Sequence, residues 1–439
     1  MQIVQVWLGK DGRSPSSSIM KPLFCLLCSI LVHSQVLAKQ PNILFIFADD
    51  LGYEQLGCYG NLKNKTPHLD QMAKEGTRFA RAYTSPVCTP SRMSVYTGMY
   101  TPRHGYTGVL PVHLGTRKAV DFAKKFPTYA QLLRKAGYMT SVTGKWQLAT
   151  LQYHPDHIRS AGFDSWCVWQ IWLDGKKTTR YWYPTLNLDG QVWKKAKSEF
   201  GPAMLTEYVI QRMKEAQTQK KPFLIHHNMM LPHVPIVDTP TNRQDGTKRS
   251  LASMIEYMDS QVGKLVEAVD TMGIADNTYI FFVGDNGTDG GDKIISAGKV
   301  IGGKRALTDG GIHVPMLARC PGKVPAGKVV QDLIDSVDFF PTLCDLAGVE
   351  VPKGQAPDGL SFKSVLHGCG PGKREWITAG ISSNFLVFDG EWRLDYQKMT
   401  LIDCRSLPEE KPADMDLPEA KEAKVKLEEI LLQLKAMRN

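Results

Sequence analysis

Short runs of apolar residues recur along the chain, and a segment with helical periodicity separates two of them. The four clearest runs are 43–47, 138–143, 223–227 and 279–283. Each has the length of a buried strand. The i, i+3, i+4 spacing of an amphipathic helix is kept between the last two runs by Leu251, Met254, Ile255, Met258, Val262, Leu265, Val266 and Val269. This alternation predicts an α/β fold, with one large, mostly parallel sheet flanked by helices on both faces.

Two further helices have clear boundary signals. Thr66 and Pro67 are typical of a helix cap and a first turn, and the helix that they open is expected to stop at Gly76. Thr128 is expected to open a second helix over 129–136. The second helix precedes the predicted strand at 138–143, which fits the same alternation.

The pattern changes beyond about residue 360. Short apolar runs at 385–388, 392–396 and 400–402 predict a small antiparallel sheet, and a charged linker over 409–416 follows them. Pro418 then opens a final helix. The apolar stripe of that helix is Leu427, Ile430, Leu431 and Leu434. We therefore divide the chain into a leader (1–38), a main domain (39–360) and a small C-terminal domain of antiparallel sheet plus helix (361–439).

The leader has the features of an export signal. Met20 and Lys21 precede an apolar run at 23–32, which is too short to span a bilayer but fits the hydrophobic region of a signal peptide. Small residues up to Ala38 offer a cleavage site, so we expect translation to start at Met20 and the mature protein to begin near Lys39. No later run is long enough for a membrane span. The protein is expected to be exported: periplasmic or secreted, or lysosomal if its source is eukaryotic.

Composition narrows the function classes. The formal charge of +9 is modest for 439 residues and forms no basic run, so it gives little support to nucleic-acid binding, although it suits an anionic substrate. Export permits disulfides, but the cysteine spacing defines no pairing.

Polar residues follow each of the four predicted strands. They are Asp49 and Asp50 after the first, Lys145 after the second, His233 after the third, and Asp285 and Asn286 after the fourth. Taken singly, such residues are usually turn, cap or solvated groups. Ligands of open α/β sheets bind outside the carboxyl ends of the strands, so the shared position of these residues predicts one site at that edge.

Four of these residues are oxygen donors, with no histidine or cysteine among them: Asp49, Asp50, Asp285 and Asn286. Oxygen ligands suit calcium or magnesium rather than zinc. A divalent cation surrounded by Lys145, Arg92 and His233 would hold a tetrahedral oxyanion such as sulfate or phosphate.

The stretch from Ser85 to Arg92 places Cys88 two residues before a proline. A cysteine there can be a thiol nucleophile, a buried core residue or a residue that is modified after synthesis. Pro90 is typical of a first helical turn, so Cys88 is expected at a helix N-terminus, where free N–H groups and the helix dipole favour an anion.

The segment Cys88-Thr-Pro-Ser-Arg92 resembles the Cys-x-Pro-Ser-Arg signature of the formylglycine-dependent sulfatases, which belong to the alkaline phosphatase superfamily. The similarity spans most of residues 40–400. It includes 41–50, 143–146, 231–235, 284–286, 303–304 and 309–315.

This resemblance implies that a maturation enzyme oxidises Cys88 to formylglycine. The hydrated aldehyde carries two hydroxyls on one carbon, one to attack sulfur and one to expel sulfate later, which a thiol cannot do. The implied ligands of one calcium ion are Asp49, Asp50, Cys88, Asp285 and Asn286. The other implied roles are that Arg92 steadies the hydrate, that Lys145 and Lys304 contact the sulfate, and that His233 protonates the departing alcohol. Residues 39–360 would then be the catalytic domain of a hydrolase for a sulfated carbohydrate or an aryl sulfate.

Three positions depart from the family pattern. Gln147 stands where the family usually has histidine, and Asp309 and His313 stand where glutamate and arginine are usual. An amide cannot accept a proton as imidazole can, so Gln147 matters most. Two alternatives therefore stay open: a phosphoesterase or phosphonate monoester hydrolase of the same superfamily, and a catalytically impaired binder of sulfated glycans.

Two other features are read as structural. An aromatic segment contains Trp166, Trp169, Trp172, Tyr181, Trp182, Tyr183 and Trp193, and we interpret it as core or local packing rather than a sugar platform. His226 and His227 are neighbours in a predicted strand, so at most one of them can face the site.

Overall fold

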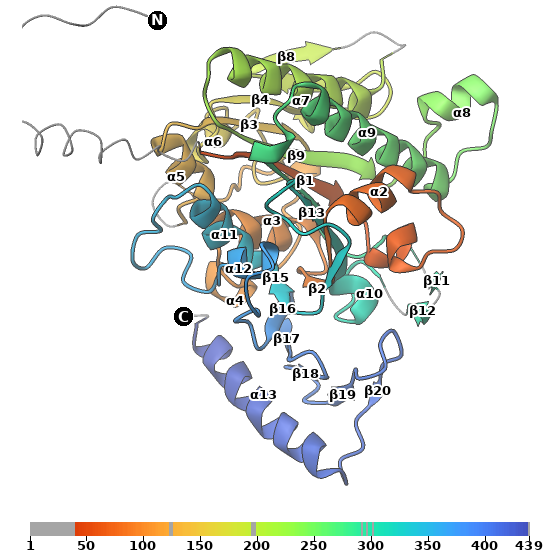
Figure 1. Cartoon of the computed structure of the whole chain (residues 1–439), viewed down its shortest axis with the longest axis vertical. Coiled ribbons are helices and arrows are strands. Elements are labelled where there is room, and N and C mark those ends of the chain that lie inside the picture. The colour runs from red at the N-terminus through yellow and green to blue at the C-terminus, as the bar shows by residue number, and fades with distance from the viewer. Residues whose placement is uncertain are drawn as a thin grey trace, which may run out of the picture. The chain divides into compact units, whose positions relative to one another are not determined.

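The computed structural model describes residues 40–122, 126–194, 199–290, 293–295, 297–300 and 303–437 (Figure 1). The predicted signal peptide and its cleavage site lie outside these residues. Within the described part of the chain, no helix is long and apolar enough to cross a membrane.

The predicted α/β fold is confirmed, and its large sheet is mixed. Side by side, its strands are β14 (Lys328–Val330), β2 (Thr77–Tyr83), β13 (His313–Arg319), β10 (Thr278–Gly284), β1 (Asn42–Asp49), β9 (Phe223–Pro232), β3 (Met139–Gly144), β4 (Ser165–Trp169), β7 (Thr185–Leu188) and β8 (Gln191–Lys194), with β15 (Ile334–Asp335) also paired to β2. The centre, from β10 to β4, is parallel. The β13, β7 and β8 strands add antiparallel neighbours on the two sides.

The four strands predicted first are adjacent in this centre, in the order β10, β1, β9 and β3. Their side chains alternate between two cores: Phe45 and Phe47 pack on one face of β1, and Leu44 and Ile46 on the other. All of them are fully buried, which explains why the strand reads as a continuous apolar run. Because the strands are parallel, their carboxyl ends lie at one edge of the sheet.

Helices cover both faces of the sheet (Figure 1). One face packs against α2 (Pro67–Glu75), α7 (Gly201–Thr218) and α9 (Leu251–Thr271). The other packs against α3 (Cys88–Thr97), α5 (Tyr129–Lys135) and α11 (Phe339–Leu346). The predicted bounds of α2 are confirmed, whereas α5 ends one residue before the predicted Ala136. Thr128 and Gln131 form a capping box at the start of α5.

A separate antiparallel sheet follows, as predicted. It consists of β16 (Ile377–Ile381), β17 (Asn384–Phe388), β18 (Trp392–Asp395), β19 (Leu401–Asp403) and β20 (Lys411–Pro412). The final helix, α13 (Pro418–Ala436), buries the predicted stripe from Leu427 to Leu434 against this sheet. The short strand β20 lies inside the segment predicted to be a linker.

Short elements complete the fold. The helices are α4 (Thr101–His104), α6 (His157–Ser160), α8 (Pro240–Asp245), α10 (Asp309–Ile312), α12 (Lys363–Leu366), η1 (Tyr53–Gln55), η2 (Gly57–Tyr59), η3 (Val112–Leu114), η4 (Ala275–Asn277) and η5 (Ser336–Asp338). Two hairpins pair β5 (Trp172–Leu173) with β6 (Lys176–Lys177) and β11 (Lys293–Ile295) with β12 (Gly298–Val300).

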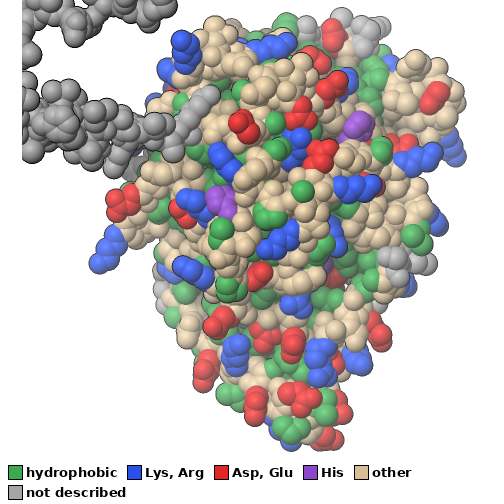
Figure 2. Space-filling model, in the orientation of Figure 1, with side chains coloured by type: hydrophobic (Ala, Val, Ile, Leu, Met, Phe, Trp, Pro, Cys, Tyr) green, Lys and Arg blue, Asp and Glu red, His purple; other side chains and the backbone are tan. Residues whose placement is uncertain are grey.

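The surface shows no gathering of one charge sign on the face seen in Figure 2, where acidic and basic side chains are interspersed. The cysteines in the described part of the chain are all free thiols. No disulfide among them therefore contributes to the core.

Candidate functional site

The strand ends bring the predicted residues together. Asp49 is the last residue of β1, and Asp50 follows it in the left-handed region with φ of 60°. Lys145 directly follows Gly144, the last residue of β3. A side chain at Gly144 is excluded, because an added Cβ would lie 1.7 Å from the carbonyl oxygen of Asn228. The backbones of β3 and β9 therefore approach closely where Lys145 enters the site.

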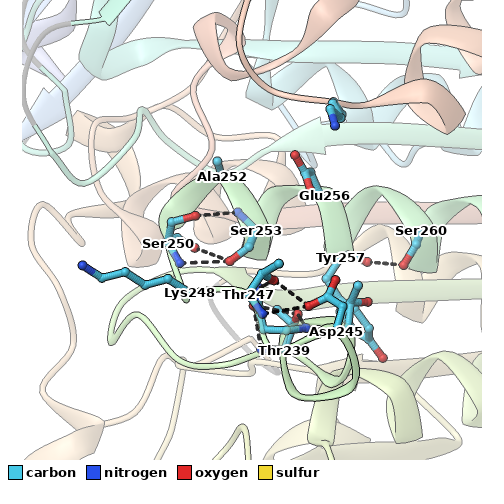
Figure 3. Close-up of a pocket in the computed structure, with 13 residues that line it drawn as sticks. Thr239, Asp245, Thr247, Lys248, Ser250, Ala252, Ser253, Glu256, Tyr257 and Ser260 are labelled. Carbon is cyan, nitrogen blue, oxygen red and sulfur yellow. Dashed lines mark hydrogen bonds between the residues drawn. The ribbon is translucent and has the colours of Figure 1, made fainter.

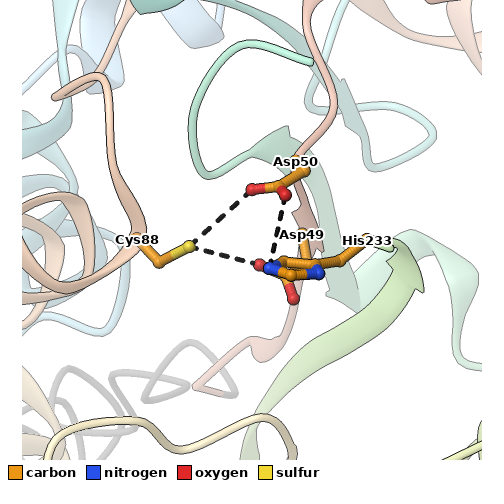
Figure 4. Close-up of side chains that lie close together, drawn as sticks. All are labelled: Asp49, Asp50, Cys88 and His233. Carbon is orange, nitrogen blue, oxygen red and sulfur yellow. Dashed lines mark hydrogen bonds and ion pairs between the residues drawn. The ribbon is translucent and has the colours of Figure 1, made fainter. Parts of the chain in front are cut away.

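Cys88 is the first residue of α3, as predicted, and faces the end of β1. Its Sγ lies 3.5 Å from Asp49 Oδ1 and 3.8 Å from Asp50 Oδ1 (Figure 4). One ligand atom from each of Asp49, Asp50, Cys88 and His233 falls within a cluster whose members are all within 4.8 Å of one another. Residues from three separate parts of the chain thus converge on one point.

Two lysines neutralise the first two carboxylates. Lys145 Nζ lies 2.6 and 2.8 Å from the two carboxylate oxygens of Asp49, and 3.2 Å from Cys88 Sγ. Lys304 Nζ lies 2.6 Å from Asp50 Oδ2. Both lysine side chains are buried, so these ion pairs are shielded from water.

Arg92 connects the third carboxylate to the neighbouring strands. Its Nη2 lies 2.8 Å from Asp285 Oδ2, and its Nη1 donates to Asn228 Oδ1 at 2.7 Å and to the Lys145 carbonyl at 3.0 Å. The guanidinium is fully buried. It lies one turn after Cys88 on α3, so it fixes that helix against the ends of β3, β9 and β10.

The oxygen donors leave one acceptor without a partner. Asn286 Nδ2 donates to Asp50 Oδ1 and to the Gly287 carbonyl, each at 2.9 Å. Its Oδ1 is buried and has no hydrogen-bond partner in the described part of the chain. An orphaned amide oxygen beside the carboxylates of Asp49 and Asp50 fits a hard cation such as calcium.

The pKa values of Asp49 and Asp285 are shifted in opposite directions. Burial alone would raise the pKa of Asp49, but the nearby Lys145, His233 and Arg92 lower it well below its ordinary value. Burial, together with the negative charge of Asp49, raises the pKa of Asp285 to about 7. The carboxylates of Asp49 and Asp285 therefore repel each other, and a cation bound between them would relieve that repulsion.

The same environment disfavours a thiolate at position 88. Burial, followed by the negative charge of Asp285, raises the pKa of the Cys88 thiol well above its ordinary value. A reactive thiolate needs a lowered pKa, so the arrangement argues against an unmodified thiol nucleophile. Burial also lowers the pKa of His233 to about 4.

The three departures from the family pattern fall in two places. Gln147 is buried in the left-handed region, with φ of 53°, and its Oε1 has no partner in the described part of the chain. Asp309 and His313 bind each other instead, with His313 Nδ1 3.0 Å from Asp309 Oδ1. Tyr53 donates its hydroxyl to the other Asp309 oxygen at 2.7 Å. This pair is a buried support behind the site.

His226 and His227 are core residues. His226 Nδ1 contacts the Tyr129 hydroxyl, and its ring packs 4.7 Å from that of Phe45. His227 Nδ1 contacts the Thr143 hydroxyl. Both histidines are buried, which agrees with the structural reading of the sequence.

Sequence reasoning missed Arg180, which lies beside the site. Its Nη2 donates to His233 Nδ1 at 2.8 Å, and its guanidinium lies over the rings of Trp169 and Tyr181, at 4.9 and 5.0 Å from their centroids. Its side chain lies within the aromatic segment interpreted as packing. In the sequence, Arg180 is a cation among those aromatic residues, and this pattern does not indicate that it lies at the site.

A groove of about 520 Å³ lies elsewhere, between α8 and the first turns of α9 (Figure 3). Its lining includes Thr239, Asp245, Lys248, Ser250 and Glu256. None of the residues described above contributes to it. The chemistry gathered at the strand ends is therefore separate from this groove.

Comparison with known proteins identifies the family. Residues 41–349 match the model of the sulfatase family. The chain belongs to this family. The resemblance carried by the segment from Cys88 to Arg92 is thereby confirmed.

Curated sulfatases include several relatives of similar identity. Human N-acetylgalactosamine-6-sulfatase is 30% identical over 351 residues, which cover 75% of this chain and 66% of the relative. Human arylsulfatase A is 30% identical over 367 residues, covering 77% of this chain and 70% of that protein. The chain thus spans about two thirds of the length of these relatives.

Solved structures confirm the sulfatase fold. The crystal structure of Ps i-CgsB matches with a TM-score of 0.79 and 27% identity, covering 91% of this chain and 94% of that one. The same protein is also known in complex with k-i-k-neocarrahexaose.

Proposed function

We propose that this sulfatase-family protein hydrolyses a sulfate ester. The observation that carries the proposal is the position of Cys88, which begins α3 and faces Asp49, Asp50 and Lys145 at the carboxyl edge of the sheet. Export to the periplasm, the lysosome or the medium, residues 39–360 as catalytic domain, and residues 361–439 as a small C-terminal domain belong to the same proposal.

Formylglycine at position 88 would supply the nucleophile. A maturation enzyme would convert Cys88 to the aldehyde, whose hydrate offers one hydroxyl to attack sulfur and a second to release sulfate. Burial and the raised pKa of the thiol support a modified residue over a thiolate. The charge of Arg92 one turn away would steady the hydrate.

One calcium ion would complete the site. It would be held by Asp49, Asp50, Asp285, Asn286 and position 88, and it would neutralise negative charge on the sulfate oxygens. The orphaned Oδ1 of Asn286 and the three buried carboxylates support this set.

The sulfate group would bind between two lysines. Lys145 Nζ is 3.2 Å from Cys88 Sγ, and Lys304 Nζ approaches from the Asp50 side, where it also lies 3.2 Å from His233 Nε2. The free N–H groups at the start of α3 add favourable partial charge. These groups would hold the sulfate oxygens while the ester bond breaks.

His233 would act on the departing alcohol. Its side chain is 18% exposed, whereas those of Asp50 and Lys304 are 2% and 4% exposed. A leaving group that points toward solvent would therefore pass His233. We assign it the role of proton donor to that oxygen. Because burial lowers the pKa of His233 to about 4, the role requires that the negative charge of the bound sulfate raise this pKa, and the Lys304 ammonium lies beside the ring at 3.2 Å.

Parallel assays test the proposal. The purified protein would be offered 4-nitrophenyl sulfate and 4-nitrophenyl phosphate, and peptide mass spectrometry would read residue 88. Sulfate turnover with an aldehyde at position 88 is expected, and phosphate turnover alone would favour the phosphoesterase alternative. Gln147 favours a second candidate, an impaired binder of sulfated glycans. That candidate would hold if such glycans bind tightly and neither ester is hydrolysed.

A further inference from the structure

Three basic residues form a rim beside the proposed sulfate site, and we call Lys177, Arg180 and His113 the cationic rim. Lys177 ends β6, and His113 lies in η3. The β5–β6 hairpin packs against η3. The contact is close, because an added Cβ at Gly115 would lie 2.4 Å from the Trp172 ring. The tertiary fold therefore holds these distant segments together.

Two of these cations lie over the Trp169 ring. Arg180 Cζ lies 4.9 Å from the centroid of the Trp169 ring, and Lys177 Nζ lies 5.9 Å from it. Trp169 itself is buried, and its Nε1 donates to Thr178 Oγ1 at 2.8 Å. The indole thus has a fixed orientation, and the side chains of Lys177 and Arg180 both lie over it.

Arg180 links the rim to the reaction site. Its Nη2 donates to His233 Nδ1 at 2.8 Å, and His233 Nε2 lies 3.4 Å from Asp50 Oδ2. Arg180 is only 6% exposed, and its Nε has no hydrogen-bond partner in the described part of the chain. A group bound by the rim would therefore lie next to the sulfate that is cleaved.

The rim lacks counter-ions, unlike the site itself. Lys145 and Lys304 are each paired with a buried carboxylate at 2.6 Å. By contrast, no carboxylate in the described part of the chain forms an ion pair with Lys177, Arg180 or His113. Among the described residues, Lys177 therefore has no carboxylate partner, whereas the Nη2 of Arg180 contacts His233 Nδ1 and the backbone carbonyls of His233 and Val234.

Burial and neighbouring positive charges both lower the pKa values of Lys177 and His113. Burial, and then the positive charges of Arg180 and Lys145, lowers the pKa of Lys177. Burial, and then the charges of Lys177 and Lys145, lowers the pKa of His113. Lys177 and Arg180 therefore repel each other, and a bound anion would relieve that repulsion and favour the protonated form of His113.

We propose that the cationic rim binds a second anionic group on the same sugar chain as the sulfate that is cleaved, so that the substrate is a polyanionic glycan. The second group is a sulfate or a carboxylate, because both accept charge-assisted hydrogen bonds from lysine and arginine. This inference rests on the proposed sulfatase function and specifies its substrate class.

The test compares sugars that differ only in the second anion. The substrates are a mono-O-sulfated hexosamine, the same sugar with a second sulfate, and the same sugar linked to a uronate. We expect the intact protein to prefer one of the doubly charged sugars by about 10-fold in kcat/KM, the range for a charged contact at a partly exposed position. The preferred sugar identifies the second group as sulfate or carboxylate.

Two variants on one strand separate the rim from general surface charge. Lys177→Gln should reduce the preference to about 2-fold or less, and Lys177→Glu should reverse it. Lys176→Gln removes the same charge from the adjacent residue of β6, which is exposed as Lys177 is, and should leave the preference unchanged. An equal preference in Lys177→Gln and the intact protein would overturn the proposal, as would the absence of any preference.

Binding measurements keep this result independent of turnover. Calorimetry would compare the affinities of the mono-anionic and di-anionic sugars for the intact protein and for Lys177→Gln. Loss of hydrolysis of every ester, with the binding preference and its Lys177 dependence retained, would refute the proposed function and support the rim. Turnover of 4-nitrophenyl sulfate without any preference among the sugars would support the function and refute the rim.

Discussion

Lys145 and Asp49 form a buried ion pair that joins the ends of β3 and β1, with Lys145 Nζ 2.6 Å from Asp49 Oδ1. The same Nζ lies 3.2 Å from Cys88 Sγ. One ammonium group thus stabilises the acid and faces the position of the nucleophile. We expect the contact with Asp49 to affect stability and the position beside Cys88 to affect catalysis.

Replacement of Lys145 tests that separation. Lys145→Met should lower kcat/KM for an aryl sulfate by ~10²-fold or more, since it removes a cation from the developing charge. It should also lower the free energy of unfolding by roughly 3 kcal/mol, because Asp49 loses its nearest partner. Activity assays and urea titration measure the two effects.

The double variant Lys145→Met with Asp49→Asn serves as the control. It should recover most of the lost stability, because no buried carboxylate is left uncompensated, but none of the activity. If the double variant is no more stable than Lys145→Met alone, the ion pair does not account for the loss.

Calcium binding gives a second prediction. Asp285→Asn and Asn286→Ala should each reduce bound calcium from one equivalent toward zero and abolish turnover, while circular dichroism stays near that of the intact protein. Elemental analysis after dialysis measures the metal. Asp309→Asn is the matched control, because that buried carboxylate is bound by Tyr53 and His313 and should leave calcium in place. Full calcium occupancy in Asp285→Asn would remove Asp285 from the ligand set.

Glu410, which directly precedes β20, connects the C-terminal sheet to the buried pair of Asp309 and His313. Glu410 Oε1 accepts from the backbone N–H of Asp309 at 3.0 Å and forms an ion pair with Arg393. The side chains of Arg393 and Glu410 are 9% and 7% exposed. Asp309 in turn accepts from the hydroxyl of Tyr53, which lies three residues after Asp50 in the sequence.

Glu410→Ala should therefore destabilise the protein by roughly 2 to 4 kcal/mol, since it leaves the Arg393 guanidinium buried without its partner. Thermal unfolding measures the change. Glu409→Ala, at the adjacent exposed residue, should change stability by less than about 0.5 kcal/mol. Equal effects of the two substitutions would show that the ion pair of Glu410 with Arg393 does not stabilise the protein.

The strand ends of the site could be predicted from the sequence because two signals coincide there. A fully buried strand reads as an apolar run, and the first polar residues after it mark the sheet edge, as at Asp49 and Asp285. The order of the strands and the antiparallel flanks could not be predicted, since no local pattern specifies which strands pair. The short strand β20 reads as a charged linker because both of its residues are exposed.

Arg180 and Asn228 show why the rest of the site was missed. Asn228 lies inside β9, where it is buried and accepts a hydrogen bond from Arg92. Arg180 follows the β5–β6 hairpin, and it contacts Trp169 in β4 and His233, which lies 53 residues further along the chain. Such contacts form only when the chain is folded, and residue type alone does not reveal them.

Gln147 leads to the last prediction. If sulfate is transferred to position 88, its release requires a base to accept a proton from the second hydroxyl, and a positioned base contributes ~10²-fold to 10⁴-fold to a rate. An amide accepts no proton, and the Oε1 of Gln147 is buried without a partner in the described part of the chain. His226, His227 and His313 are not positioned to act as a substitute base. His226 and His227 lie in the core, and His313 is bound at both ring nitrogens.

Release of sulfate should therefore be slower than cleavage of a good aryl ester. Rapid mixing with 4-nitrophenyl sulfate should show a burst of phenol followed by slow turnover, and quenched samples should contain a sulfated peptide at position 88. Gln147→His should raise the steady rate more than the burst rate, while Gln147→Asn, which also lacks a base, should not. A wild-type protein with ordinary turnover, no burst and no sulfated peptide would show that another group accepts the proton.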